Sequence, residues 1–326
     1  MIAATRQSED EALLERGWAA LPASYRIPRF APSLEEARAY CRRLAESHYE
    51  NFTVASWLLP KALRPHFYAI YAYCRVADDL ADEVGDKALA LALLDRWGHE
   101  LDDCYEGRTR HPVFVALAET IRACSIPKGP FADLLTAFRQ DQTVARYASR
   151  EDVLAYCRYS ANPVGRLVLY VCNEAGEERF GFSDATCSAL QLANFWQDVR
   201  RDYAKGRIYL PQQDMKRFGV GEETIARGPA TPEFRALLRH EVDFTRGLFE
   251  KGLGLIGRVP GKLALDLELF SRGGMEILRA IELQDYDVLA SRPALSKDAK
   301  VKLVLRALGA RALPMLRLGG RTGEVA

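Results

Sequence analysis

Residues 71–83, YAYCRVADDLADE, place two aspartates four residues apart in an otherwise apolar stretch. On a helix, Asp78 and Asp82 lie on one face on consecutive turns, and Tyr71 and Arg75 continue the same stripe. Like charges at this spacing mildly destabilise a helix. Mg²⁺ binds carboxylate oxygens while keeping water and substrate phosphates in its shell. Taken alone, the stretch fits either a solvated acidic face or one half of a magnesium site.

A second stretch, residues 191–202 (QLANFWQDVRRD), repeats this pattern. Gln191, Asn194, Asp198 and Asp202 follow one another at three- and four-residue spacing, so they share a helix face. Facing each other across a bundle, the two acidic pairs would hold several Mg²⁺ ions and help a diphosphate to leave as an anion. The expected metal ligands are Asp78, Asp82, Asn194, Asp198 and Asp202. Nearby aromatics could face a carbocation or simply fill the core, among them Tyr73, Phe195 and Trp196.

Apolar residues recur at helical spacing along most of the chain, which predicts an all-α fold. Start signals are expected at Ser149 and Ser183, and residues 208–211 are expected to be extended but too short to found a sheet. His111, which precedes a proline, is expected to be structural. The predicted helices span residues 64–84, 89–105, 130–143, 150–172, 183–205, 232–255 and 261–284.

Neither a repeat nor a linker divides the chain, so we expect one large helical bundle over residues 31–308. Residues 1–30 are predicted to form a loosely attached arm, and residues 309–326 a C-terminal tail. From Lys297 onward the chain carries seven Lys/Arg against two Asp/Glu, mixed with apolar residues. That segment fits a terminal helix with a solvated face, or a basic amphipathic segment that rests on anionic lipid.

Composition excludes several classes of protein. The 326 residues carry 45 Lys+Arg and 44 Asp+Glu, a net charge of +1, which argues against a protein that coats nucleic acid. No apolar run reaches membrane-spanning length, and the acidic N-terminal residues do not resemble a signal peptide. Seven cysteines without a CxxC indicate reduced thiols. We therefore expect a cytoplasmic protein, with peripheral contact to the inner face of the membrane as an open alternative.

Together these motifs resemble the squalene and phytoene synthase family. Asp78 and Asp82, with Tyr71 and Arg75 before them, look like its first aspartate-rich motif, and residues 194–211 resemble the second. Residues 156–165 match its substrate-lining helix, and residues 286–292 its C-terminal diphosphate-binding segment. The resemblance spans residues 45–305 and implies an isoprenoid-synthase fold with a central cavity, in which Mg²⁺ assists ionisation of an isoprenyl diphosphate.

Residues 50–55 and 160–165 look most like the hydroxysqualene synthases of bacterial hopanoid pathways, which convert presqualene diphosphate to hydroxysqualene. Gln197, Asn51 and Met275 stand where the wider family usually has Arg, Ser and Tyr, and Arg200-Arg201 stands where an acidic residue is common. The resemblance implies catalytic roles for Asp78, Asp82, Asp198, Asp202, Tyr71 and Tyr156. It implies substrate contacts from Asn51, Phe52, Arg75, Ala161, Val164, Gly165, Gln191, Gln197 and Arg292.

Other activities remain open at this stage. One alternative is a head-to-head prenyl transferase that makes presqualene diphosphate, squalene or phytoene, with farnesyl diphosphate as the substrate for the squalene-type products. Another alternative is a non-catalytic helical protein that binds lipid. A reductive squalene synthase would need NADPH. Residues 252–257 match GxGxxG, but helical residues precede them where the nucleotide-binding fingerprint requires a strand. We therefore expect Mg²⁺ as cofactor and no NADPH.

Overall fold

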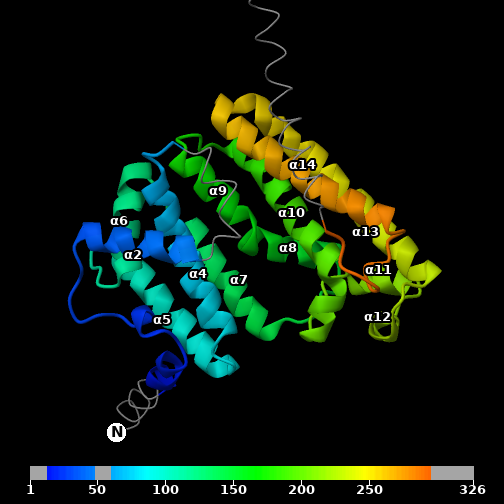
Figure 1. The fold of residues 1–326 in the computed structure, drawn as a ribbon, viewed down its shortest axis with the longest axis horizontal. Coiled ribbons are helices and arrows are strands. Elements are labelled where there is room, and N and C mark those ends of the chain that lie inside the picture. The colour runs from blue at the N-terminus through cyan, green and yellow to red at the C-terminus, as the bar shows by residue number, and fades with distance from the viewer. Residues whose placement is uncertain (1–12, 48–59, 295–326) are drawn as a thin grey trace, which may run out of the picture. The chain divides into compact units, whose positions relative to one another are not determined.

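The computed structural model describes residues 13–47 and 60–294. The predictions for Asn51, Phe52 and the basic segment from Lys297 onward lie outside the described residues. The chain divides into two compact units. The N-terminal unit comprises Met1–Ala145 and Leu154–Phe180, and the C-terminal unit comprises Arg146–Val153 and Gly181–Ala326. Figure 1 shows that the described residues fold into helices in both, as the all-α prediction requires.

The N-terminal unit is built around α4 (Arg64–Asp82), the helix that carries the first acidic motif. Its apolar side is almost continuously buried, and Tyr73 lies at the centre, packing edge-on against Phe114 and Phe131 and donating a hydrogen bond to the Phe131 carbonyl at 2.9 Å. Tyr73 is therefore a core residue. The helices that pack against α4 are α2 (Leu34–Ser47), α5 (Lys87–Tyr105), α6 (Pro112–Cys124), α7 (Gly129–Thr143) and α9 (Asn162–Val171).

The C-terminal unit contains most of α10 (Glu177–Ala204), the helix with the second acidic motif. Trp196 is buried on this helix and donates a hydrogen bond to Thr245 at 2.8 Å, so it too is a core residue. A Cβ atom on Gly274 would meet the Phe249 ring at 2.2 Å, which explains the glycine at this helix crossing. The other elements are α11 (Gln212–Arg217), α12 (Glu222–Arg227), α13 (Pro232–Gly252), η2 (Leu253–Arg258) and α14 (Gly261–Leu283).

Two of the predicted helix boundaries are wrong. The single helix predicted over residues 150–172 is broken at Ala161 into α8 (Arg150–Ser160) and α9. Pro163 explains the break, because proline lacks a backbone N–H and restricts the residue before it. Ser183 does not start a helix: α10 begins at Glu177, and Ser183 is buried inside it.

Other local predictions are confirmed. Ser149 and Asp152 form a reciprocal capping box at the start of α8, and buried His111 accepts a hydrogen bond from the Val113 N–H at the start of α6. Residues 208–211 form only an isolated bridge, between Ile208 and Arg146. Within residues 13–47 and 60–294, no helix combines the length and apolarity needed to cross a bilayer.

Candidate active site

The first acidic motif lies near the C-terminal end of α4, where Asp78 is half-buried and Asp82 is exposed. Burial and the neighbouring charge of Asp82 raise the pKa of Asp78 to about 6. The nearest guanidinium, Arg75, reaches Asp78 only at 3.5 Å. The motif therefore presents two carboxylates on one helix face, and one of them has little compensating positive charge.

Arg75 is held mainly by Asp79, a residue that sequence reasoning passed over. Asp79 is 5% exposed and accepts hydrogen bonds from both the Arg75 guanidinium and the Tyr25 hydroxyl, the latter at 2.5 Å. The Asp79 carboxylate is thus itself buried, and it orients the guanidinium group of Arg75. The signal was present in the sequence, because Arg75 and Asp79 form an i, i+4 pair and the apolar Val76 and Leu80 flank the buried face.

The second motif lies near the C-terminal end of α10. Asn194 is exposed, whereas Gln191, Asp198 and Asp202 are half-buried. Burial and the charge of Asp198 raise the pKa of Asp202 to about 6. This motif therefore repeats the property found on α4, a carboxylate whose ionised form is disfavoured by burial and by an acidic neighbour one turn away.

Arg292 lies directly on Asp198. Its Nε and Nη2 atoms donate to the two carboxylate oxygens at 2.6 and 2.8 Å, a bidentate pair. The same Nη2 donates to the Gln197 side-chain oxygen at 2.9 Å, and the Gln197 amide donates to the Pro293 carbonyl at 2.5 Å. Gln197 is 4% exposed. It holds residues 292–293 against α10, a role that a second arginine at this position could not perform because arginine has no acceptor.

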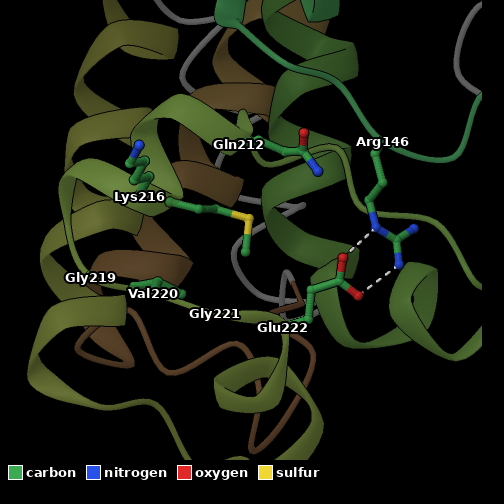
Figure 2. A pocket seen from close by; sticks show the side chains of 8 residues that line it. Arg146, Gln212, Lys216, Gly219, Val220, Gly221 and Glu222 are labelled. Carbon is green, nitrogen blue, oxygen red and sulfur yellow. Dashed lines mark hydrogen bonds and ion pairs between the residues drawn. The ribbon is translucent and has the colours of Figure 1, made fainter.

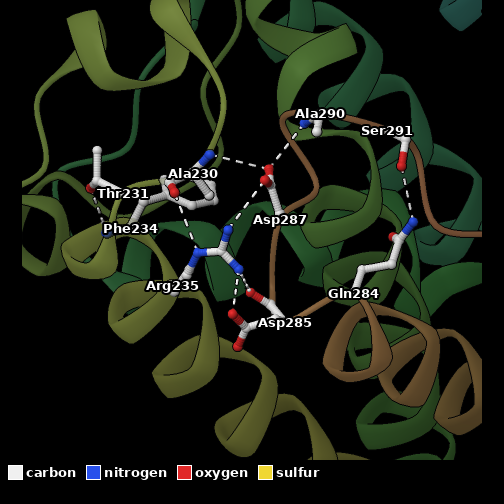
Figure 3. A network of polar contacts seen from close by, with 9 residues as sticks. All are labelled: Ala230, Thr231, Phe234, Arg235, Gln284, Asp285, Asp287, Ala290 and Ser291. Carbon is white, nitrogen blue, oxygen red and sulfur yellow. Dashed lines mark hydrogen bonds and ion pairs between the residues drawn. The ribbon is translucent and has the colours of Figure 1, made fainter.

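A polar network holds residues 285–290, the segment that precedes Arg292, in place (Figure 3). Arg235 donates to the backbone and side-chain oxygens of Asp285, both at 2.5 Å, and to Asp287 at 3.3 Å. Asp287 in turn accepts from the N–H groups of Ala230 and Ala290, at 3.1 and 3.0 Å. The segment from Asp285 to Ala290 is therefore bound to the start of α13, two residues before Arg292.

The segment that follows the second motif, Gly206 to Pro211, is anchored by Arg146. Arg146 donates to the Gly206 carbonyl at 2.6 Å and forms a bidentate pair with Glu222 at 2.7 and 2.8 Å, which Figure 2 shows. These two residues border a cavity of 430 Å³. None of the residues expected at the active site lines this cavity, so Arg146 and Glu222 act as structural supports.

The remaining predicted residues lie in the N-terminal unit, except for those outside the described residues. Tyr71 is half-buried on α4, one turn before Arg75. Tyr156 on α8 is buried and donates a hydrogen bond to Asp141 at 3.0 Å. Ala161 stands at the α8–α9 break, followed by the exposed Val164 and half-buried Gly165 on α9, a helix that contacts α4.

One acidic cluster was not expected from the sequence. Ligand-type atoms of Asp214, His240 and Glu241 lie within 4.8 Å of one another in the C-terminal unit. Arg150 already donates to Asp214 at 3.3 Å and to Glu241 at 3.2 Å. A guanidinium between the two carboxylates supplies the positive charge that a metal ion would bring, so we interpret this cluster as a buried ion-pair network.

Comparison with known proteins gives a consistent result. Residues 45–299 match the family model described as squalene/phytoene synthase. Phytoene synthase 1 of Zea mays is 30% identical over 294 residues, which cover 86% of this chain and 70% of that protein. The 15-cis-phytoene synthase of Synechococcus elongatus is 30% identical over 82% of this chain and 91% of its own length.

Solved structures agree in fold and sequence. The crystal structure of squalene synthase HpnC from Alicyclobacillus acidocaldarius is 44% identical, with a TM-score of 0.75 over 83% of this chain and 99% of that chain. A dehydrosqualene synthase determined in complex with a ligand is 28% identical, with a TM-score of 0.77 over 86% and 98% of the two chains. The chain therefore belongs to the squalene/phytoene synthase family.

Proposed function

We propose that this protein is a hydroxysqualene synthase, which converts presqualene diphosphate to hydroxysqualene. Family membership supports chemistry on a prenyl diphosphate, and similarity to a protein named squalene synthase HpnC supports a squalene-type carbon skeleton. The observation that carries the finer assignment is the contact among Asp198, Arg292 and Gln197.

This contact favours a substrate with one diphosphate. An enzyme that joins two farnesyl diphosphates must hold two diphosphate groups, and it gains from additional cations near the acidic motifs. Position 197, where relatives usually have arginine, carries a neutral amide whose hydrogen bonds are used to hold Arg292 and Pro293. Gln197 therefore adds no positive charge. Arg292 is then the cation closest to Asp198 that can bind a diphosphate.

The residues of both motifs fit Mg²⁺. Asp78, Asp82, Asn194, Asp198 and Asp202 all offer oxygen atoms, the donors that Mg²⁺ prefers. The raised pKa values of Asp78 and Asp202 indicate a local demand for positive charge. We expect the residues of each motif to bind Mg²⁺, which when bound would supply positive charge to the departing diphosphate.

The chain's own residues then have separate roles. Arg75 and Arg292 bind diphosphate oxygens through planar guanidinium groups, for which lysine is a poor replacement. Arg292 releases Asp198 and binds the diphosphate in its place, which would leave the Asp198 carboxylate available to the metal. Gln197 keeps Arg292 within reach during this exchange.

The reaction balances without a reductant. The bond between the substrate carbon and the diphosphate oxygen breaks, and the electron pair leaves with the diphosphate. The resulting cyclopropylcarbinyl cation rearranges, water adds its oxygen to the rearranged cation, and one proton is released. Asn51, Gln191 and Asn162 are the candidates to position that water; among them, Gln191 is half-buried and Asn162 buried, in different units.

The test is to incubate the purified protein with presqualene diphosphate and Mg²⁺ in H₂¹⁸O, without NADPH, and to identify the products by mass spectrometry. We expect hydroxysqualene that carries one ¹⁸O atom. Unlabelled product, or an absolute requirement for NADPH, would contradict the proposal. A parallel incubation with EDTA should give no product.

A head-to-head prenyl transferase is the second candidate, and the phytoene synthase relatives favour it. The same experiment distinguishes the two when farnesyl or geranylgeranyl diphosphate is supplied as the only substrate. Efficient formation of presqualene diphosphate or phytoene would establish this second activity in place of the first.

A further inference from the structure

A cavity of 540 Å³ in the C-terminal unit is lined by a group of arginines. Arg200 and Arg201 come from α10, Arg227 ends α12, and Arg292 follows the segment fixed by Asp287. Among the described residues that line this cavity, none is acidic. We call it the arginine cavity.

Two of these arginines are uncompensated. Within the described part of the chain, neither Arg200 nor Arg227 forms an ion pair with a carboxylate, although both are exposed. Arg201 reaches Asp198 only at 3.6 Å and is 66% exposed. Of the four arginines, only Arg292 has a close carboxylate partner among the residues that the structure describes, at 2.6 Å. Gathering these like charges raises the free energy of the folded chain unless an anion is bound between them.

The backbone beside the cavity accommodates a guanidinium. A Cβ atom on Gly228 would lie 2.5 Å from the Nη1 atom of Arg200, so any other residue at this position would displace that guanidinium. Gly228 also adopts a φ of +37°, which disfavours residues with a side chain. The loop after α12 therefore lets Arg200 lie against the backbone next to Arg227.

The arginine cavity adjoins the acidic face of α10 and extends around the helix to the side that carries Arg200. Arg200 follows Asp198 by two residues, which is a rotation of about 200° around the helix axis. Asn194, Asp198 and Asp202 share the other side. Arg201 and Arg292 line the cavity and also contact Asp198, so these two arginines link the two sites, whereas Arg200 and Arg227 belong to the cavity alone.

We propose that the arginine cavity is a second anion site, which binds a phosphate or diphosphate group without a metal ion. Arginine pairs bidentately with phosphate oxygens, and the cavity offers several guanidinium groups from separate elements. Two sources share this chemistry: the inorganic diphosphate that the family's reaction releases, and the phosphate of an anionic lipid headgroup. The site goes beyond the proposed function and does not depend on which product the enzyme makes.

The test measures binding in EDTA, so that a metal-dependent diphosphate site does not contribute. Inorganic diphosphate is titrated into the full chain by calorimetry, and binding to phosphatidylglycerol vesicles is measured against phosphatidylcholine vesicles. We expect Arg200→Gln and Arg227→Gln each to weaken binding of one of these probes at least tenfold. The probe that responds identifies the source.

Arg217→Gln is the matched control, because Arg217 is an exposed arginine of the same unit outside the cavity lining. It should bind both probes as the wild type does. Circular dichroism confirms that each variant is folded. The proposal is overturned if the wild type binds neither probe in EDTA, or if Arg200→Gln and Arg227→Gln bind both probes normally.

Discussion

The helices α4 and α10 carry the same acidic spacing, but their arginines are held in different ways. On α4, Arg75 comes from the helix itself and is bound to buried Asp79, and its contact with the motif residue Asp78 is weaker. On α10, Arg292 comes from a segment 94 residues away and lies directly on the motif residue Asp198. Arg75 is therefore held beside the first motif by a residue outside the acidic pair, whereas Arg292 is bound to an aspartate of the second motif itself.

The two ion pairs therefore differ in role, because one is structural and the other can exchange partners. Asp79 and Arg75 form a largely buried pair, and removal of one partner is costly because it leaves the other charge buried without compensation. The pair between Arg292 and Asp198 is partly exposed and can exchange one oxygen ligand for another. We therefore expect substitution of Asp79 to affect stability, and substitutions around Arg292 to affect substrate use.

The largest expected effect is loss of turnover from either motif. Asp78→Asn and Asp198→Asn each replace a carboxylate with an amide of the same shape, which removes a metal ligand's charge. We expect turnover of presqualene diphosphate to fall roughly a thousandfold, about 4 kcal/mol in activation free energy, with helix content unchanged by circular dichroism. Asp243→Asn, an exposed site on α13, is the control. Near-normal turnover in either motif variant would reject the metal assignment.

The second prediction separates neighbours on α4. Asp79→Asn leaves the Arg75 guanidinium without its charged partner and weakens the hydrogen bond to Tyr25. We expect the free energy of unfolding to fall by about 3 kcal/mol, measured by urea denaturation. Asp78→Asn should not lower that free energy, because Asp78 contacts Arg75 only at 3.5 Å and burial already disfavours its ionised form. Equal destabilisation by the two variants would remove the distinction drawn between these two aspartates.

A third prediction concerns Glu241, whose carboxyl is buried beside Asp214, His240 and Arg150. Burial, despite the opposing effect of Arg150, raises the pKa of Glu241 from 4.5 to about 7. Between those pH values the folded state holds a proton that the unfolded state has released, so stability falls as pH rises from 4.5 to 7. Glu241→Gln mimics the protonated form and should remove the contribution of Glu241 to that slope.

Urea denaturation at a series of pH values measures this effect. The stability of Glu241→Gln relative to the wild type should increase between pH 4.5 and 7 and stay constant above pH 7. Glu250→Gln, an exposed position on the same helix, should keep the wild-type slope. An identical slope in the wild type and Glu241→Gln would show that Glu241 ionises in the folded state as it does in the unfolded state.

Local periodicity predicted much of the fold and part of the candidate site. Spacing of three and four residues placed Asp78 with Asp82, and Asp198 with Asp202, because one helix turn brings such residues onto one face. The α8–α9 break was missed although Pro163 was visible, because the apolar spacing continues across it. Periodicity therefore predicts faces well and interruptions poorly.

Long-range pairing was beyond such reasoning. The contact of Gln197 with Arg292 joins residues 95 apart, and nothing in the spacing of either stretch encodes it. The resemblance placed both residues near the substrate without relating one to the other. Only the fold shows that the departure at position 197 supports the arginine at position 292.

The smallest predicted effect tests that support. Gln197→Leu keeps a similar volume but removes the acceptor for Arg292 and the donor for the Pro293 carbonyl. A hydrogen bond to a charged group contributes about 1.5–3 kcal/mol, so kcat/KM for presqualene diphosphate should fall at least tenfold. Gln197→Glu keeps an acceptor for Arg292 and should retain more activity than Gln197→Arg, which sets a like charge beside it. If all three variants lost activity equally, Gln197 would have to contact the substrate directly, and its role in holding Arg292 would be wrong.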